Sequence, residues 1–150
     1  MNASSHRVGN LTVNRLFELD LDGFEATRLL PGLDLAALAR HPAGLDPRVY
    51  DAATGKVRMS VHTWVVRGEG RTVLIDTGAG NGKARPTMGV LDNLHGPYLA
   101  RLAELGVRPE EVDAVLLTHV HADHVGWNTQ RRDGRWVPTF PNATVVVSDL

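Results

Sequence analysis

The sequence contains no cysteine among its 150 residues. Disulfide bonds, thiolate metal sites and cysteine nucleophiles are therefore excluded, and any metal ion must be bound by nitrogen and oxygen atoms. The net charge of −1 gives no sign of a nucleic-acid-binding surface or a polybasic membrane surface. The chain has no apolar run of membrane-spanning length and no apolar signal core at its start. These absences predict a soluble, cytoplasmic protein that binds neither nucleic acid nor membrane.

The first part of the chain, residues 1–60, has weak patterning. Residues 11–20 alternate loosely between apolar and polar, as a strand does. Residues 21–56 are broken by prolines and glycines, with one short predicted helix at 33–40. A stretch with so little regular structure is either a lid over a functional site or surface padding. The length fits one domain over residues 1–150.

The second part, residues 61–150, interleaves strands and helices more clearly. The short apolar runs are typical of strands that are buried on both faces. This alternation predicts the α/β class, with helices packed on a sheet. The expected elements are a hairpin of strands at 61–66 and 72–76, a helix within 97–106, a helical turn near 109, a strand at 114–118, a hairpin turning at Asp133–Gly134, and a strand at 143–148.

Three of the seven histidines lie within the segment "THVHADH", directly after the apolar strand that Thr118 ends. Loops at the carboxyl ends of strands are where α/β sheets place ligands. His119 and His121 are two residues apart, so both project to one side of an extended segment and can chelate one ion. A turn would carry Asp123 and His124 to a second point nearby. Imidazole and carboxylate together suit zinc, iron or manganese.

Chance clustering and pH sensing are the alternatives to a metal site in this segment. A pH-sensing cluster would not need to lie where a strand passes into a loop. A metal site accounts for both the residue types and their placement. Two ions about 3.5–4 Å apart can share a hydroxide and stabilise the oxygens of a hydrolytic transition state.

Two motifs resemble the metallo-β-lactamase fold. "THVHADH" is similar to the His-x-His-x-Asp-His signature of that family. "TVLIDTGAG", about forty residues earlier, resembles the family's strand ending in Asp-x-Gly. The order and spacing of the two motifs make the match specific, and the resemblance covers roughly residues 61–150. "HADHVGWNT" and the hairpin after it look most like the branch of quorum-quenching lactonases and organophosphate or aryl-ester hydrolases.

The resemblance implies a role for each motif residue. His119 and His121 would bind one divalent ion, and Asp123 and His124 the other; Asp123 is also the predicted catalytic residue. The ions would be two, zinc by preference, with iron or manganese as alternatives. Asp76 would not bind metal but would support the metal-binding loop by hydrogen bonds, which orients the ligands. A simpler role for Asp76 is to cap the turn of the glycines that follow it.

The resemblance also implies that part of the domain is absent. The family fold is an αβ/βα sandwich of two similar halves, and this chain corresponds to the N-terminal half. The remaining ligands, a histidine, a bridging aspartate and a further histidine, are expected beyond Leu150. We therefore expect residues 1–150 alone to be inactive, to bind metal weakly, and to self-associate through the exposed half-domain face.

The implied function of the complete protein is binuclear metal-dependent hydrolysis. A metal-bound hydroxide would attack a small ester-like substrate, which could be a lactone, an aryl ester or a phosphotriester. A thioesterase of the glyoxalase II type is an alternative, and a nuclease is a third, disfavoured by the low net charge. A non-catalytic metal-binding or interaction fragment is the alternative from a different class.

Several residues outside the two motifs have both a structural and a functional interpretation. His62, beside Trp64 on a predicted strand, is expected to pack against the sheet rather than bind metal. Trp127, Trp136 and Phe140 could line a substrate pocket, although aromatic residues in a hairpin more often belong to the core. The loop "GAGNGKARP" is rich in glycine but lacks the Gly-Lys-Ser/Thr ending of a phosphate-binding P-loop.

Overall fold

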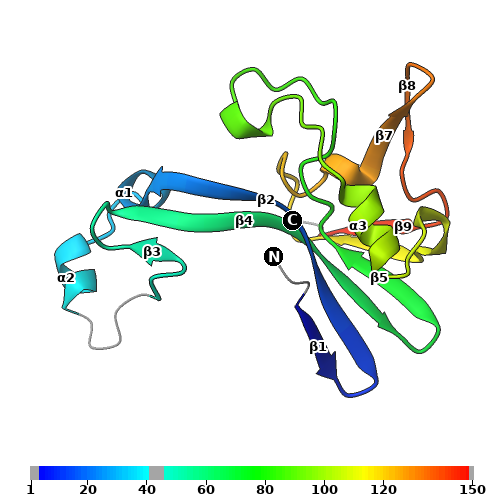
Figure 1. Cartoon of the computed structure of the whole chain (residues 1–150), viewed down its shortest axis with the longest axis horizontal. Coiled ribbons are helices and arrows are strands. Elements are labelled where there is room, and N and C mark those ends of the chain that lie inside the picture. The colour runs from blue at the N-terminus through cyan, green and yellow to red at the C-terminus, as the bar shows by residue number, and fades with distance from the viewer. Residues whose placement is uncertain (1–3, 41–45, 149–150) are drawn as a thin grey trace. The chain divides into compact units, whose positions relative to one another are not determined.

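The computed structural model describes residues 4–40 and 46–148 and divides the chain into two compact units. The larger unit contains Met1–Glu18 and Val61–Leu150, and the smaller one is Leu19–Ser60. The two long strands β2 and β4 (blue and green in Figure 1) each have residues in both units. The assignment of residues 1–150 to one domain stays a prediction.

A mixed sheet with strand order β1-β2-β4-β5-β6-β9 forms the framework, and β3 pairs with β4 beside this path. The pairs β1–β2, β3–β4 and β4–β5 are antiparallel, whereas β5–β6 and β6–β9 are parallel. The parallel pairs with a crossover helix confirm the predicted α/β class. The strands are β1 (Ser5–Val8), β2 (Leu11–Glu25), β3 (Tyr50–Asp51), β4 (Lys56–Gly68), β5 (Arg71–Ile75), β6 (Ala114–Leu117) and β9 (Thr144–Val147).

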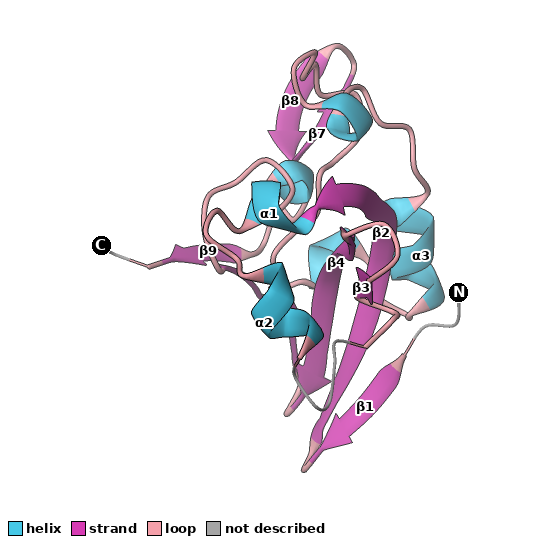
Figure 2. Ribbon diagram, turned by 90° about the vertical axis from the view of Figure 1, so that its left-hand side faces the viewer, coloured by secondary structure: helices cyan, strands magenta, loops and turns pink. Residues whose placement is uncertain are grey.

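The core of the larger unit lies between the central strands and helix α3 (Tyr98–Glu104). Leu74 of β5 and Val115 of β6 are register partners and are fully buried against the core. On the opposite face of β6, Leu116 is 38% exposed, so the expectation that this strand is buried on both faces is wrong. On α3, Tyr98 and Leu102 are four residues apart and therefore face the same side, toward the sheet. Figures 1 and 2 both show α3 beside the strands. The helix predicted within residues 97–106 is confirmed.

Segments with 3₁₀ or α geometry and one small hairpin complete the fold. The hairpin of β7 and β8 turns at Asp133 and Gly134, which both have positive φ, as predicted from the Asp-Gly pair. The remaining elements are α1 (Ala26–Leu29), α2 (Leu35–Ala39), η1 (Gly89–Leu91), η2 (Pro109–Glu111), η3 (Gly126–Asn128), β7 (Thr129–Arg132) and β8 (Arg135–Pro138).

The smaller unit is more regular than the sequence predicts. Strand β2 does not stop near residue 20 but continues to Glu25, and α1, α2 and β3 follow it. The expectation of little regular structure over residues 21–56 is therefore wrong. The reason is long-range pairing: β2 lies beside β4, and Ala26 N–H donates to the Gly55 carbonyl at 3.0 Å. The predicted role of this segment as a lid stays a prediction.

Strand β9, predicted at residues 143–148, is apolar but exposed. The accessible fractions of Val145, Val146 and Val147 are 53%, 47% and 50%. The sheet therefore presents an apolar strand at this edge. Self-association through the exposed half-domain face stays a prediction. Among residues 4–40 and 46–148, no helix has the length and hydropathy needed to cross a membrane.

Candidate metal centre

Two loops leave the sheet where the parallel strands β5 and β6 end. Ile75 pairs with Leu116, and Asp76 N–H extends the pairing by donating to the Leu116 carbonyl at 2.9 Å. The loop after β5, residues 77–80, is called the glycine loop, and the loop after β6, residues 118–125, the histidine loop. Because parallel strands end at the same edge, the two sequence motifs meet there.

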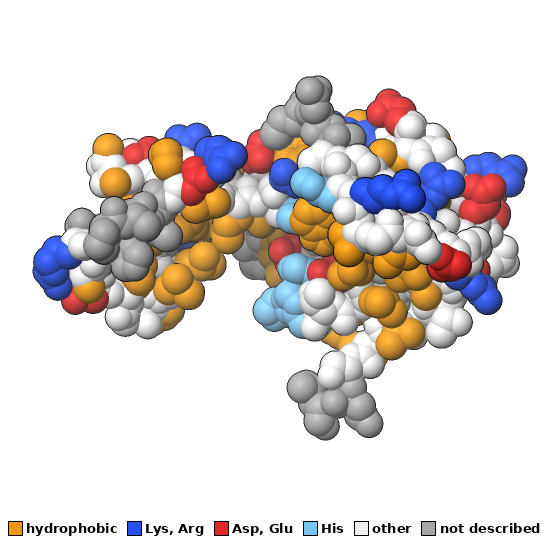
Figure 3. Space-filling view, turned by 90° about the horizontal axis from the view of Figure 1, so that it is seen from below, with side chains coloured by type: hydrophobic (Ala, Val, Ile, Leu, Met, Phe, Trp, Pro, Cys, Tyr) orange, Lys and Arg blue, Asp and Glu red, His pale blue; other side chains and the backbone are white. Residues whose placement is uncertain are grey.

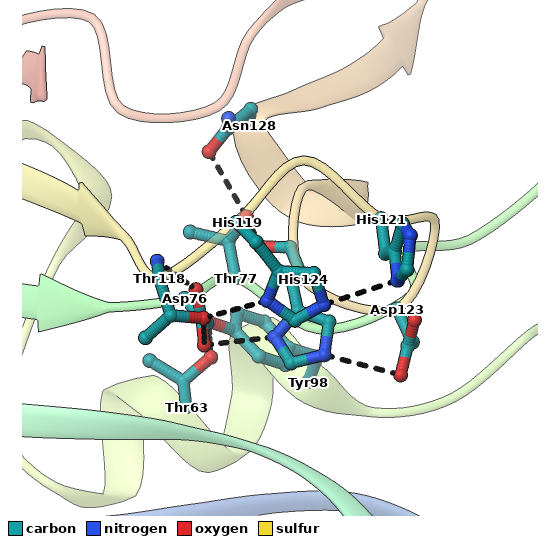
Figure 4. A network of polar contacts seen from close by, with 10 residues as sticks. All are labelled: Thr63, Asp76, Thr77, Tyr98, Thr118, His119, His121, Asp123, His124 and Asn128. Atoms are coloured by element: carbon teal, nitrogen blue, oxygen red, sulfur yellow. Dashed lines mark hydrogen bonds and ion pairs between the residues drawn. The ribbon is translucent and has the colours of Figure 1, made fainter. Parts of the chain in front are cut away.

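Asp76 joins the two motifs through its carboxylate. Its Oδ1 accepts from Thr118 N–H at 2.9 Å, and its Oδ2 accepts from the Thr118 hydroxyl and from His124 Nδ1, both at 2.8 Å (Figure 4). Asp76 has a φ of 57°, a left-handed conformation that aspartate tolerates better than most residues. Asp76 therefore holds the start of the histidine loop and the ring of His124 at once.

The charge of Asp76 is stabilised by these contacts. Burial would raise the pKa of its carboxyl group, but the hydrogen bonds from His124 and Thr118 together outweigh burial and lower it. A carboxylate without a proton only accepts hydrogen bonds. Both the Thr118 hydroxyl and His124 Nδ1 must therefore donate to it.

This donor pattern determines where the imidazole protons lie. The Thr118 hydroxyl gives its one proton to Asp76, so it must accept from His119 Nδ1, which is 3.0 Å away. In the neutral rings, His119 and His124 thus carry their proton on Nδ1 and a lone pair on Nε2. A lone pair on the outward nitrogen is what a metal ligand requires.

Four side chains bring together two neighbouring pairs of possible metal-ligand atoms (Figure 4). His119 Nε2 lies 3.1 Å from His121 Nδ1, and His124 Nε2 lies 3.3 Å from Asp123 Oδ2. The rings of His119 and His124 bring the pairs together, with centroids 4.0 Å apart. His119 and His121 are exposed, and histidine side chains are visible on the surface in Figure 3.

These pairs fit a divalent ion. Two ligands of one tetrahedral zinc ion, each about 2.0–2.1 Å from it, are about 3.3 Å apart. In the second pair, a lone pair of His124 faces a carboxylate oxygen of Asp123, an arrangement that a cation between them stabilises. No group of three or more histidine or acidic side chains is arranged around one point within residues 4–40 and 46–148. Each pair thus supplies two ligands.

Glu18 on β2 supports the site and is not singled out by the sequence motifs. Its buried carboxylate accepts from Ala79 N–H at 2.6 Å, Gly80 N–H at 3.1 Å and the Trp127 indole N–H at 2.7 Å. The amides of the glycine loop are therefore capped by Glu18 and not by Asp76. An acid two residues after the inward-facing Leu16 is the signal that could have identified it.

Backbone hydrogen bonds join the glycine loop to the end of the histidine loop. Thr77 N–H donates to the His124 carbonyl, and Gly126 N–H donates to the Gly78 carbonyl, both at 2.7 Å. A Cβ on Gly126 would lie 1.9 Å from the backbone of Ala79, so only glycine fits. The bend predicted at Gly126 thus allows the two loops to touch directly behind His124.

The aromatic residues and His62 divide between core and surface. Trp127 and Phe140 are buried in the core, and Trp127 stacks on Tyr98 with centroids 4.8 Å apart. Trp136 is 47% exposed and lies under the ammonium group of Lys83. The ring of His62 packs edge-on against Trp64, with centroids 5.0 Å apart, as expected for a sheet histidine.

The fold contains an α/β sheet, and pairs of histidine and carboxylate side chains lie at its strand ends. The chain is therefore a candidate metal-binding α/β protein. The model of the metallo-beta-lactamase superfamily matches residues 57–148. The chain belongs to this superfamily, and the predicted resemblance is confirmed. Ribonuclease TTHA0252 of Thermus thermophilus is 46% identical over 83 residues, which are 54% of this chain and 16% of that protein.

Solved structures share the fold. AidC, a dizinc quorum-quenching lactonase, aligns with a TM-score of 0.66 and 19% identity over 96% of this chain and 44% of its own. A probable metal-dependent hydrolase from Staphylococcus aureus aligns with a TM-score of 0.70 and 19% identity, covering 93% and 47%. The hydrolase AbOPH of the beta lactamase superfamily aligns at 0.55 and 26% identity, covering 95% and 43%. The chain spans less than half the length of these proteins.

Proposed function

We propose that this chain contributes the His-x-His-x-Asp-His half of the active site of a metal-dependent hydrolase. One observation carries the proposal: the hydrogen bonds of Asp76 and Thr118 place the protons of His119 and His124 on Nδ1. The Nε2 atoms of both rings therefore have a lone pair that can bind a metal ion. The family membership supports the same conclusion.

The ligands divide between two divalent ions, for which zinc is the preferred identity. His119 and His121 would hold one ion, and Asp123 with His124 would hold the other. AidC, which shares the fold, is a dizinc enzyme. Bound ions would supply Lewis-acid activation of water and of the substrate carbonyl or phosphorus centre.

The chain's own side chains orient this chemistry. Asp76 accepts from His124 Nδ1 and thereby keeps the lone pair on Nε2 directed outward. Asp123 turns Oδ2 toward His124, and its side chain is 28% accessible, so water can reach it. Oδ1 of Asp123 would accept a hydrogen bond from the attacking water and orient it, which makes Asp123 the proposed catalytic residue.

The proposed substrates are small esters in the broad sense: lactones, aryl esters or phosphotriesters. The fold shared with a quorum-quenching lactonase and with the hydrolase AbOPH supports this class. A second candidate is RNA cleavage, which the identity to a ribonuclease over 83 residues favours. The net charge of −1 argues against it, because a nuclease needs a cationic surface for the phosphate backbone.

A hydrolysis panel on the zinc-loaded natural protein that contains this chain tests the proposal. The panel comprises a lactone, an aryl ester, a thioester, a phosphotriester and an RNA oligonucleotide, with His121→Ala as the matched inactive variant. We expect turnover of an oxygen ester or phosphotriester that is lost in the variant. Thioester or RNA turnover alone would select the alternative activity, and His121-independent turnover would overturn the assignment of the site.

A further inference from the structure

Arg85 contacts the backbone of two nearby segments and of one segment that is 37 residues away in the sequence. Its Nη1 donates to the carbonyl of Ala79 at 2.9 Å and to that of Leu91 at 3.3 Å, and its Nη2 donates to the carbonyl of Ala122 at 2.9 Å. Ala79 belongs to the glycine loop, and Ala122 lies in the histidine loop between His121 and Asp123. One guanidinium group thus bridges the two loops that form the site.

The backbone that carries Arg85 is itself held in place. Arg85 N–H donates to the carboxylate of Asp92, and Asn93 N–H donates to the Lys83 carbonyl at 2.9 Å. These bonds close a loop from which the Arg85 side chain extends toward the histidine loop. Because the base of the side chain is fixed, less conformational entropy is lost when its head group binds the three carbonyls.

The hydrogen bond from Arg85 reaches the Ala122 carbonyl in the middle of the histidine loop, between the two fixed ends of this loop. The start of the histidine loop is fixed by the bonds of Thr118 to Asp76, and its end is fixed by the bond between Thr77 and His124. Between these points, the proposed ligands His121 and Asp123 lie on a turn. Its local bonds run from His124 N–H and Val125 N–H to the His121 carbonyl, at 3.0 and 3.3 Å. Arg85 ties the middle of this turn to the glycine loop.

We propose that Arg85 is a positioning residue that holds His121 and Asp123 in register with His119 and His124 for metal binding. The inference rests on the proposed function, because the ligands are those assigned there. Arg85 does not bind metal or substrate. It fixes the peptide between the two ligand pairs, so that donor atoms from both sides of Ala122 keep their spacing.

Lysine cannot replace arginine in this role. A guanidinium group is planar and directs five N–H donors outward, so it can satisfy three carbonyls from two nitrogens. A lysine ammonium group has three donors around one atom and cannot reach carbonyls on both sides of the head group at these distances. Arg85→Lys therefore keeps the charge and removes the bridge.

Arg101 provides the matched control. It also donates to backbone carbonyls in the same unit, those of Phe17 at 2.8 Å and Glu18 at 3.2 Å, and it is likewise part-buried. Its contacts are with β2, and it does not touch the histidine loop. Arg101→Lys therefore removes comparable hydrogen bonds to backbone carbonyls and leaves the bridge that Arg85 forms between the two loops unchanged.

The test has two readouts on the whole chain. The first is amide hydrogen exchange of His124 and Val125 without metal, because both N–H groups are hydrogen-bonded within the turn. The second is a Zn²⁺ titration followed by NMR of the histidine rings. We expect Arg85→Lys to speed exchange at His124 and Val125, whose N–H groups donate to the His121 carbonyl, and to weaken Zn²⁺ binding about tenfold or more, the range of effects of residues that orient ligands. Arg101→Lys should change neither readout in this loop.

The outcomes separate this inference from the function it rests on. Unchanged exchange and unchanged Zn²⁺ affinity in Arg85→Lys, with affinity still lost in His121→Ala, would overturn the role of Arg85 and leave the metal site standing. Faster exchange in Arg85→Lys, with Zn²⁺ binding insensitive to His121→Ala, would support the bridge and overturn the metal assignment. Equal effects of Arg85→Lys and Arg101→Lys would show a general loss of stability and would overturn the inference.

Discussion

His119 and His121 are exposed, whereas Glu18 and Asp76, which hold the loops behind them, are each 8% exposed. Each of the two carboxylates accepts three hydrogen bonds from protein donors. We call His119, His121, Asp123 and His124 the ligand face, and Glu18 and Asp76 the support face. The polar atoms of the support face are hydrogen-bonded to the two loops that form the site. The proposed ligand atoms contact one another, whereas the residues that hold the loops in place bind protein donors.

The largest expected effect comes from removing a side chain of the ligand face. His121→Ala removes a proposed metal ligand, so we expect zinc binding and hydrolysis by the natural protein to fall by several orders of magnitude. Because the side chain is exposed, the free energy of unfolding without metal should change by less than about 0.5 kcal/mol. Activity assays and urea unfolding of the metal-free protein measure the two effects, and an active variant would contradict the assignment.

At Glu18, on the support face, we expect a substitution to change mainly the stability of the fold. Three N–H donors converge on its carboxylate, and in Glu18→Gln one accepting oxygen is replaced by an NH₂ group that faces a donor. We expect the free energy of unfolding to fall by about 3 kcal/mol, as for a buried charged network that is broken. Urea unfolding checks this, with the exposed Glu104→Gln as the control. Equal stability of the two variants would show that Glu18 is not the anchor of the glycine loop.

Asp76 belongs to the support face but touches the ligands, so its loss should affect both properties. Asp76→Asn keeps an acceptor for Thr118 N–H and tolerates the positive φ, but its NH₂ group cannot accept from His124 Nδ1. We expect zinc affinity to fall about 10–100-fold, the range for a residue that orients a ligand. Competition with a chromophoric chelator measures the affinity. A loss as complete as in His121→Ala would mean that Asp76 binds metal itself.

The smallest expected effect concerns acid stability away from the site. The hydrogen bond from Thr72 N–H and that from the Arg71 guanidinium hold the pKa of Asp113 below its ordinary value. A lowered pKa in the folded state contributes stability above the unfolded pKa, and this contribution is lost as the pH falls through the folded value. Asp113→Asn should therefore flatten the decline of stability from neutral pH to about pH 3. Urea unfolding across this range measures the difference, and parallel curves would refute the prediction.

The central fold could be predicted well because the signals there are local. The apolar runs of β5 and β6, the helical spacing of Leu99, Leu102 and Leu105, and the Asp133–Gly134 turn each depend on a few neighbouring residues. The extension of β2 to Glu25 was not predicted, because it depends on pairing with β4, a strand much later in the chain. Pairing between distant strands supplies hydrogen bonds that no local pattern records.

The candidate site divides in the same way. The motif residues were identified from their types and spacing, since imidazole and carboxylate side chains at a strand end have few structural reasons to gather. The support from Glu18 and Arg85 was not, because neither residue belongs to a recognisable motif. Their roles arise from loops that converge from three parts of the chain.

Residue types at fixed spacing were enough to establish the family, the α/β class and the identity of the four proposed ligands. Folding in three dimensions decided which nitrogen of His119 and of His124 carries the proton, since that depends on the hydroxyl of Thr118 and the carboxylate of Asp76 meeting them across two loops. It also decided that Glu18 caps the glycine loop and that Arg85 reaches Ala122. Hydrogen bonds are directional and short, so only the positions of atoms brought together by folding can assign them.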